Sequence, residues 1–91
     1  MEPIRFRSQV RYWNPDKAGG LAVTDIPSAH IPALGGLKQR RVSGTVQGVA
    51  FASNVMPAGG GRLALSVSKA MMTAAGIGIG GEADFEITAR G

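Results

Sequence analysis

The sequence predicts a small all-β domain: a closed β-barrel of about six short, mostly antiparallel strands with two short helical turns. Three observations support this fold class. Apolar and polar residues alternate over several short segments, which is the period of a strand with one buried face. The fourteen glycines are spread over the 91 residues, as tight turns between short strands require. A weak internal repeat of strand, helical turn and glycine would close the sheet on itself.

The first half of the chain starts with a strand and continues to a helical turn. Residues Ile4–Tyr12 place apolar side chains on one face and mostly basic ones on the other, and only Ser8 breaks the alternation. The residues 14–20, rich in glycine and polar side chains, predict a loop before a short strand at Leu21–Thr24. Two prolines favour a short helical turn at Pro27–Leu34, because proline suits a first turn but cannot continue a helix.

A hairpin is predicted for Val42–Val55. Its apolar residues change phase at Gln47-Gly48, as they do on the two sides of a two-residue turn. Pro57 and the glycines Gly59–Gly61 predict the next turn. The apolar residues of Leu63–Val67 then alternate as a further strand.

The last third of the chain combines a short helix with a strand. Ser68 is a good N-cap residue, and Lys69–Ala75 follows it as a helix of about two turns. Gly76 suits the left-handed position that ends a helix. After a glycine turn, Glu82–Ala89 alternates between apolar and polar, mostly acidic, side chains, which predicts the last strand.

The order of strand, helical turn, glycine and strand occurs twice. The segment that begins with Leu21–Thr24 and continues to Gly35 is similar to the segment that begins with Leu63–Ser66 and continues to Gly76. Two such halves, related by a pseudo-twofold axis, would close a small barrel and leave no free strand edge. We therefore expect a single β-barrel domain over residues 1–91.

Composition excludes several classes of protein. The chain has no cysteine, so it has neither disulfides nor thiolate metal sites. No apolar run approaches the ~20 residues of a membrane helix, and the first residues lack the apolar core of a signal peptide. We expect a soluble cytoplasmic protein that does not enter a membrane. The formal charge of +4 permits an anionic partner but does not require one.

Catalytic and metal-binding patterns are weak. His30 is the only histidine, and no cluster of ligands has a recognisable metal spacing. Asp84 and Glu86 share a strand face about 7 Å apart, but a solvated outer face explains them. The glycine runs Gly59–Gly61 and Gly78–Gly81 lack the lysine spacing and the long helix of a phosphate loop. We expect no enzyme activity, no catalytic or metal-binding residues and no cofactor.

Two groups of basic residues are the candidate anion-binding or nucleic-acid-binding sites. The first lies on the outer face of the first strand with one aromatic residue, and the second enters the hairpin: Arg5, Arg7, Arg11 and Trp13, then Lys38, Arg40 and Arg41. A cationic face with an aromatic side chain can bind a single strand through phosphate contacts and base stacking. The alternative, which we favour, is that these arginines pair across strands with Glu82, Asp84 and Glu86.

Over roughly its whole length, and specifically from Arg41 onward, the chain resembles a bacterial family, DUF1905, a domain of unknown function. In the N-terminal third, Gly19-Gly20-Leu21 stands where members usually have a strand that contains a tryptophan. Arg41–Phe51 resembles its central hairpin, Leu65–Ala70 its next strand and helix start, and Ala74–Gly80 the signature before its last strand. The resemblance implies a double-split β-barrel, a fold shared with swapped-hairpin DNA-binding proteins of the AbrB and MazE type. Met72 stands where those DNA-binding proteins usually carry an arginine, and Gly81 where they carry an aspartate.

These arguments predict a non-catalytic binding or interaction module with an unknown ligand or protein partner. The alternative function is a nucleic-acid-binding barrel of the swapped-hairpin regulator type. We also expect a homodimer, because the Lys69–Ala75 helix has almost no polar face and twofold pairing is the commonest symmetry. Met71 and Met72 are its candidate interface residues. In the other interpretation one chain already contains both halves of the barrel, and the methionines point inward.

Overall fold

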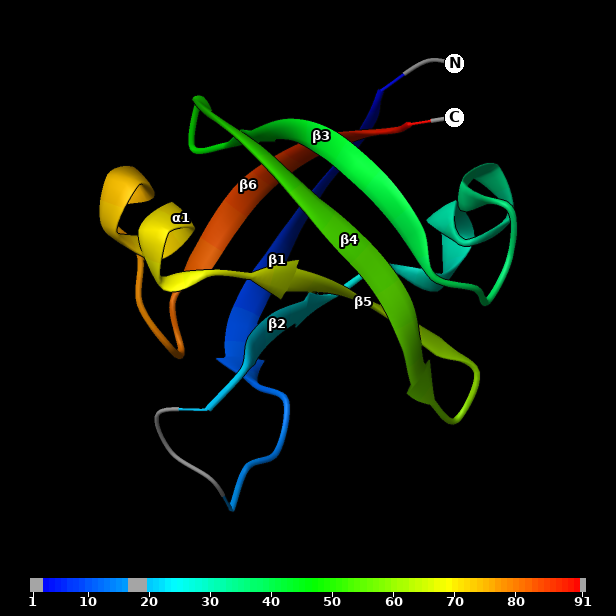
Figure 1. Cartoon of the computed structure of the whole chain (residues 1–91), viewed down its shortest axis with the longest axis horizontal. Helices are drawn as coiled ribbons and strands as arrows, with labels where there is room; N and C mark the ends of the chain where they lie inside the picture. Colours follow the sequence, from blue (N-terminus) through cyan, green and yellow to red (C-terminus); the bar gives the residue numbers. More distant parts are fainter. Residues whose placement is uncertain (1–2, 17–19, 91) are drawn as a thin grey trace.

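The computed structural model describes residues 3–16 and 20–90, and within these ranges the chain forms a closed six-stranded barrel (Figure 1). The strands follow the order β1-β2-β5-β4-β3-β6 around the barrel, and every neighbouring pair is antiparallel. The elements are β1 (Ile4–Tyr12), β2 (Ala22–Asp25), η1 (Ser28–His30), η2 (Pro32–Leu34), β3 (Arg40–Val46), β4 (Val49–Gly59), β5 (Arg62–Val67), α1 (Lys69–Ala75) and β6 (Glu82–Ala89). The predicted fold class is confirmed.

The barrel consists of two halves with the same topology. The first half is β1, β2, η1, η2 and β3, and the second is β4, β5, α1 and β6. Exchanging the halves strand for strand leaves the order around the barrel unchanged, as a pseudo-twofold axis requires. Both helical segments also end at a left-handed glycine, Gly35 with φ 87° and Gly76 with φ 68°. The weak sequence repeat therefore corresponds to a structural one.

Each half leaves part of one strand hydrogen-bonded on one side only, and a helical segment lies there. β1 pairs with β2 only from Val10 to Tyr12, although it pairs with β6 from Ile4 onward. β4 pairs with β5 only from Val55 onward. The η1 segment lies beside β1, where the His30 and Phe6 ring centroids are 6.3 Å apart, and α1 lies against β4. The helical segments thus cover the two openings of the barrel.

The core fills the barrel and extends under both helical segments. Leu34 of η2 is fully buried, and Met71 of α1 is 8% exposed. The strands contribute inward side chains at alternate positions: Ile4, Phe6, Val10, Ala22, Val42, Val46, Val55, Leu63, Leu65, Val67, Ala83, Phe85 and Ile87. Thr24 is a buried polar residue whose hydroxyl donates to the Gln9 carbonyl at 2.9 Å. No helix in the described part of the chain is long and apolar enough to span a membrane.

The hairpin turn is where the sequence predicted it, and the structure explains its unusual residue. Val46 pairs with Val49, so Gln47 and Gly48 form a two-residue turn with φ 50° and φ 79°. Both values are positive, which usually favours Asn or Gly over Gln. Here the Gln47 side-chain oxygen accepts a hydrogen bond from the Asp84 amide at 2.7 Å. The longer side chain therefore connects the turn to β6.

Two segments differ from the prediction. Pro57, expected in a turn, lies within β4, which continues to Gly59 with a register shift after Pro57. Proline is tolerated there because β4 no longer pairs with β3 beyond Val55, so the missing amide leaves no ladder bond unmade. The helical turn expected at Pro27–Leu34 is divided into two 3-10 turns, since Pro32 starts the second one.

Candidate anion-binding surface

The outer face of β1 and β6 carries a ladder of ion pairs. Arg5 lies opposite Glu86 and donates to it at 2.6 Å. Arg7 lies opposite Asp84, which it contacts at 3.1 Å, and it also reaches Glu82 at 3.3 Å. The hydrogen bond to Asp84 is the main reason why the pKa of Arg7 is raised, with Glu82 adding to it. The pairing that the sequence analysis favoured is present for these two arginines.

Arg11 pairs with a different strand from the one expected. Its guanidinium donates two hydrogen bonds to the carboxylate of Asp25 on β2, at 3.0 and 2.9 Å, rather than to an acid on β6. The reason is the register: Arg11 is beyond the last β1–β6 pair and lies opposite Val23 of β2. The hydrogen bond to Arg11 lowers the pKa of Asp25, against the opposing effect of burial, and the charges of Arg11 and Arg62 lower it further. We call the surface formed by these three arginines and their four carboxylate partners the paired face: Arg5, Arg7, Arg11, Asp25, Glu82, Asp84 and Glu86.

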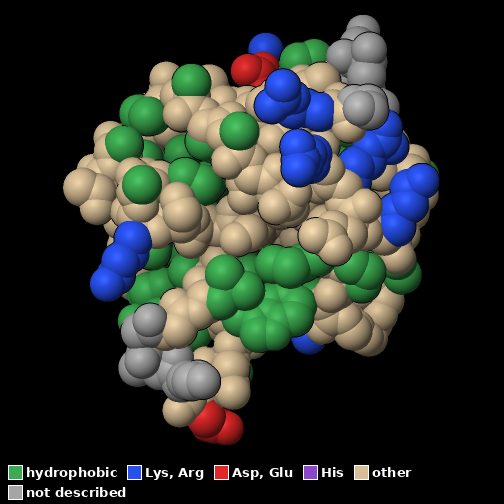
Figure 2. Space-filling model, viewed as in Figure 1, with side chains coloured by type: hydrophobic (Ala, Val, Ile, Leu, Met, Phe, Trp, Pro, Cys, Tyr) green, Lys and Arg blue, Asp and Glu red, His purple; other side chains and the backbone are tan. Residues whose placement is uncertain are grey.

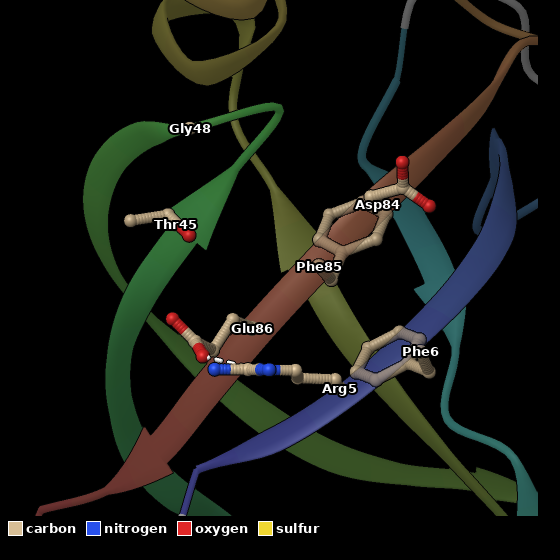
Figure 3. Close-up of a pocket in the computed structure, with 7 residues that line it drawn as sticks. All are labelled: Arg5, Phe6, Thr45, Gly48, Asp84, Phe85 and Glu86. Atoms are coloured by element: carbon tan, nitrogen blue, oxygen red, sulfur yellow. Dashed lines mark hydrogen bonds and ion pairs between the residues drawn. The ribbon is translucent and has the colours of Figure 1, made fainter.

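A surface hollow lies on the paired face. It measures about 530 Å³ and is lined by Arg5, Phe6, Thr45, Gly48, Asp84, Phe85 and Glu86 (Figure 3). Arg5 extends across β6 to Glu86, while Asp84 points away from that pair. The three charged side chains of this hollow already have partners, because Asp84 is bound by Arg7. The hollow therefore offers no uncompensated charge to a ligand.

A different arrangement holds on the other side of β6, where β3 lies between β4 and β6. Arg41 of β3 and Arg90, which directly follows β6, are cross-strand neighbours joined by a backbone hydrogen bond of 2.9 Å from the Arg90 amide to the Arg41 carbonyl. On its other side Arg41 lies opposite Asn54 of β4. The three residues surround a hollow of about 240 Å³. Like charges directly opposite each other on a sheet repel, so this pair is unfavourable without a counter-ion.

Lys38 and Arg40 extend this basic region toward η2. Their side chains lie around Gly35: the position of a Cβ on Gly35 would be 2.9 Å from Arg40 Nη1 and 3.0 Å from Lys38 Cε. Arg40 is half-buried and donates to the Leu34 carbonyl at 3.3 Å. The predicted group of Lys38, Arg40 and Arg41 is thus split, because successive residues of β3 point to opposite faces of the strand.

We refer to Lys38, Arg40, Arg41 and Arg90 as the basic cluster, which has two parts: Arg41 and Arg90 are outward neighbours, and Lys38 and Arg40 lie around Gly35 at the start of β3. Within residues 3–16 and 20–90, none of its members forms a salt bridge, whereas all four salt bridges belong to the paired face. The other charges of the sequence are six basic and six acidic residues, so the cluster accounts for the whole formal charge of +4. Figure 2 shows basic side chains gathered over the β3 side of one face, with acidic ones only at its edge.

Sequence reasoning missed Arg90 and Asn54. Arg90 has the outward phase of the last strand, but it becomes a neighbour of Arg41 only through the β3–β6 register. That pairing joins segments almost fifty positions apart, and alternation within a strand carries no information about it. The outward position of Arg90 could therefore be predicted from the sequence, but its position beside Arg41 could not.

The candidate interface residues on α1 lie differently from each other. Met71 belongs to the core, so little of it is available to a partner, and Met72 is partly buried against the core. The exposed side of α1 consists of Lys69 and the small residues Ala70, Thr73 and Ala74. The homodimer stays a prediction, and light scattering at micromolar concentration tests it. The mass of a single chain that persists on concentration would mean that one chain, with its closed barrel, needs no partner.

The described residues show no arrangement typical of catalysis. They contain no group of three or more His, Asp or Glu side chains able to hold a metal ion. Asp84 and Glu86 are each held by an arginine. His30 has the Phe6 ring beside it and forms no salt bridge in this part of the chain.

Comparison with known proteins gives the chain a family but not an activity. No curated protein matches the sequence. The domain of unknown function DUF1905 matches it over residues 6–87, which include all of the barrel except the ends of β1 and β6. This match covers most of the chain, and it includes both halves of the barrel. The protein therefore belongs to the DUF1905 family.

Proposed function

We propose that this domain is a non-catalytic binding module that takes up an anionic partner on the basic cluster. The observation that carries the proposal is the separation of charges. The paired face balances its arginines with carboxylates, whereas Arg41 and Arg90 lie side by side with no described carboxylate on either. An anion bound between the two guanidinium groups would relieve their repulsion.

The chemistry of the cluster suits phosphate or carboxylate oxygens. Guanidinium groups bind such oxygens with charge-assisted hydrogen bonds, often two at a time. The side-chain amide of Asn54, opposite Arg41, can donate a further hydrogen bond. Catalysis is not part of the proposal, because the acidic side chains of β6 are held in ion pairs and the sequence contains no thiol.

Two double variants with equal net charge test the proposal with inorganic polyphosphate as the probe. Arg41→Ala/Arg90→Ala removes the cluster pair, and Arg5→Ala/Arg7→Ala removes the same charge from the paired face. We expect the first variant to bind polyphosphate at least about tenfold more weakly than the unaltered protein, since the loss of even one charge-assisted hydrogen bond of about 1.5 kcal/mol has that effect. The second should bind within about twofold of the unaltered protein, because its arginines already have partners. Equal losses in both variants, or no binding by the unaltered protein, would overturn the proposal.

A further inference from the structure

A second unusual feature lies on the outer face of β2 and β5. Val23 and Ala64 are fully buried, yet neither belongs to the core cluster inside the barrel. Both point outward, since Val23 lies opposite Arg11, and Ala64 alternates with the core residues Leu63 and Leu65. Side chains on the outer surface must therefore cover them. Figure 2 shows an apolar patch in this region of the molecule.

Trp13 and Leu21 stand beside Val23 in this outer layer. The Trp13 amide donates to the Leu21 carbonyl at 2.7 Å, which places the two residues opposite each other, one outward position beyond the Arg11–Val23 pair. Trp13 is 38% exposed and Leu21 47% exposed. With Asn14 and Gly20 they line a hollow of about 310 Å³. A flat group could therefore lie against the indole ring from solvent.

The strand register connects this aromatic site to the basic cluster. Outward residues follow one another as cross-strand neighbours from Arg90 to Arg41 and Asn54, and again from Ser66 to Val23. Between these two parts β4 and β5 are not paired, and the Ser53 hydroxyl donates to the Ser66 carbonyl at 2.7 Å. The row extends over four strand spacings, about 19 Å or more along the surface. The row begins with two cationic side chains, continues with the hydrogen-bonding residues Asn54 and Ser66, and ends at the apolar Val23. None of these five residues is acidic. The nearby carboxylate of Asp25 on β2 is paired with Arg11. Phosphate binding and aromatic stacking are thus available along one continuous line.

We infer that this row binds a single-stranded nucleic acid, with a phosphate on Arg41 and Arg90 and a base stacked on Trp13. The inference rests on the proposed function and names its partner. Paired arginines suit a phosphodiester, and an exposed indole beside a hollow suits an unstacked base. A duplex keeps its bases stacked and would leave Trp13 without a role. The described helices are at most seven residues long, and none lies on this row to enter a major groove.

Trp13 is the only tryptophan, so its fluorescence reports base stacking directly. We propose titrations of the protein with oligothymidylate, with an abasic oligonucleotide of the same length, with duplex DNA and with polyphosphate. Oligothymidylate should quench the fluorescence and bind about fivefold or more tightly than the abasic strand, as expected for stacking of one base. For Arg41→Ala/Arg90→Ala the slope of log K against log salt should become less steep by about 0.7, because the pair neutralises one phosphate and about 0.7 is lost per phosphate of a single strand.

Substitutions of the indole separate stacking from folding. Trp13→Phe keeps an aromatic ring and should bind oligothymidylate within about threefold of the unaltered protein, whereas Trp13→Leu should lose about fivefold or more. Because these variants contain no tryptophan, the anisotropy of a dye-labelled oligothymidylate measures their binding. Ile79→Ala, another exposed apolar residue, is the matched control and should bind normally. The thermal unfolding of each variant shows that it is folded.

The outcomes also separate the inference from the proposed function. Polyphosphate binding that depends on Arg41 and Arg90, without quenching by oligothymidylate, overturns the nucleic-acid inference and keeps the anion-binding proposal. Duplex DNA bound more tightly than the single strand likewise overturns the inference. Binding of none of these probes overturns both.

Discussion

The barrel carries exposed arginines on two sides, in the same strand geometry but with different neighbours. On the paired face, β1 arginines lie beside the acidic strand β6 and beside Asp25 of β2. In the basic cluster, Arg41 of β3 lies between Asn54 and Arg90. The outward position of an arginine therefore does not decide its role; the residues on the two adjacent strands do. A neutral neighbour on one side and a like charge on the other leave Arg41 available to an anion.

The paired face and the basic cluster differ more in net charge than in their contribution to stability. Exposed ion pairs such as Arg5–Glu86 contribute between zero and about 1 kcal/mol each. The carboxylates of β6 instead cancel the field of the β1 arginines within the reach of ionic screening, about 8 Å at physiological salt. The arginines of the basic cluster have no such carboxylate beside them in the described part of the chain.

The largest effect on stability is expected from a substitution between β3 and β6, the two strands whose pairing brings Arg41 and Arg90 together. Gly44 lies opposite Ile87, and a Cβ on Gly44 would be 1.7 Å from the Glu86 carbonyl oxygen, a backbone atom that cannot move aside. Gly44→Ala should lower the free energy of unfolding by about 3 kcal/mol or more, measured by urea denaturation. It should also separate Arg41 from Arg90.

Gly48→Ala is the matched control for Gly44→Ala. No atom lies within 4 Å of a Cβ on Gly48, so only its φ of 79° opposes the substitution. We expect a loss of about 1 kcal/mol. Equal urea midpoints for the two variants would mean that the barrel tolerates a side chain at Gly44, and that the close approach of β3 and β6 there does not determine its stability.

A smaller difference in the free energy of unfolding is expected when one arginine is removed from the paired face or from the basic cluster. Arg11→Met should lower the free energy of unfolding by up to about 1 kcal/mol, because it leaves Asp25 without its two hydrogen bonds. Arg41→Met should leave it unchanged or raise it by a few tenths of a kcal/mol (about 0.3), because the repulsion from Arg90 disappears. Chemical denaturation at low ionic strength is the measurement. A larger loss for Arg41→Met would show that the basic cluster stabilises the barrel.

The dependence of stability on pH should be weak and should involve Asp25. Arg11 lowers the pKa of this carboxyl below its ordinary value of 3.8, so in that range the unfolded state binds more protons than the folded one. The contribution to stability is complete above 3.8 and is lost as the pH falls through the lower pKa of the folded state. In Arg11→Met this loss on acidification should be smaller. If Arg11→Met loses as much stability on acidification as the unaltered protein, the loss arises from other carboxylates.

Much of the fold could be predicted from the sequence because its signals are local. The bounds of β1, α1 and β6 follow from alternation, from the Ser68 cap and from the Gly76 stop, and the structure has the same bounds. The Ser68 hydroxyl does accept from the Met71 amide, at 3.1 Å. The β4 strand was harder, because proline and glycine indicate a turn unless the end of pairing with β3 is known.

The candidate site was predicted only in part, for the same reason. The basic residues were identified, but whether each is neutralised depends on register. The acids of β6 lie opposite Arg5 and Arg7, which alternation suggested, while Arg11 extends beyond them to β2. The Arg41–Arg90 neighbours and the row to Val23 arise only when the barrel closes. Long-range pairing is the information that one sequence does not contain.

The most direct measurement observes the arginine side chains themselves. Arginine Nε–Hε resonances, recorded by nuclear magnetic resonance during a polyphosphate titration, report which guanidinium groups meet the anion. The separation of charges predicts that the resonances of Arg41 and Arg90 shift progressively and saturate, while those of Arg5, Arg7 and Arg11 stay in place because carboxylates already occupy them. Shifts that are largest at Arg5 or Arg7, or equal on both sides of the barrel, would contradict the assignment of anion binding to the basic cluster.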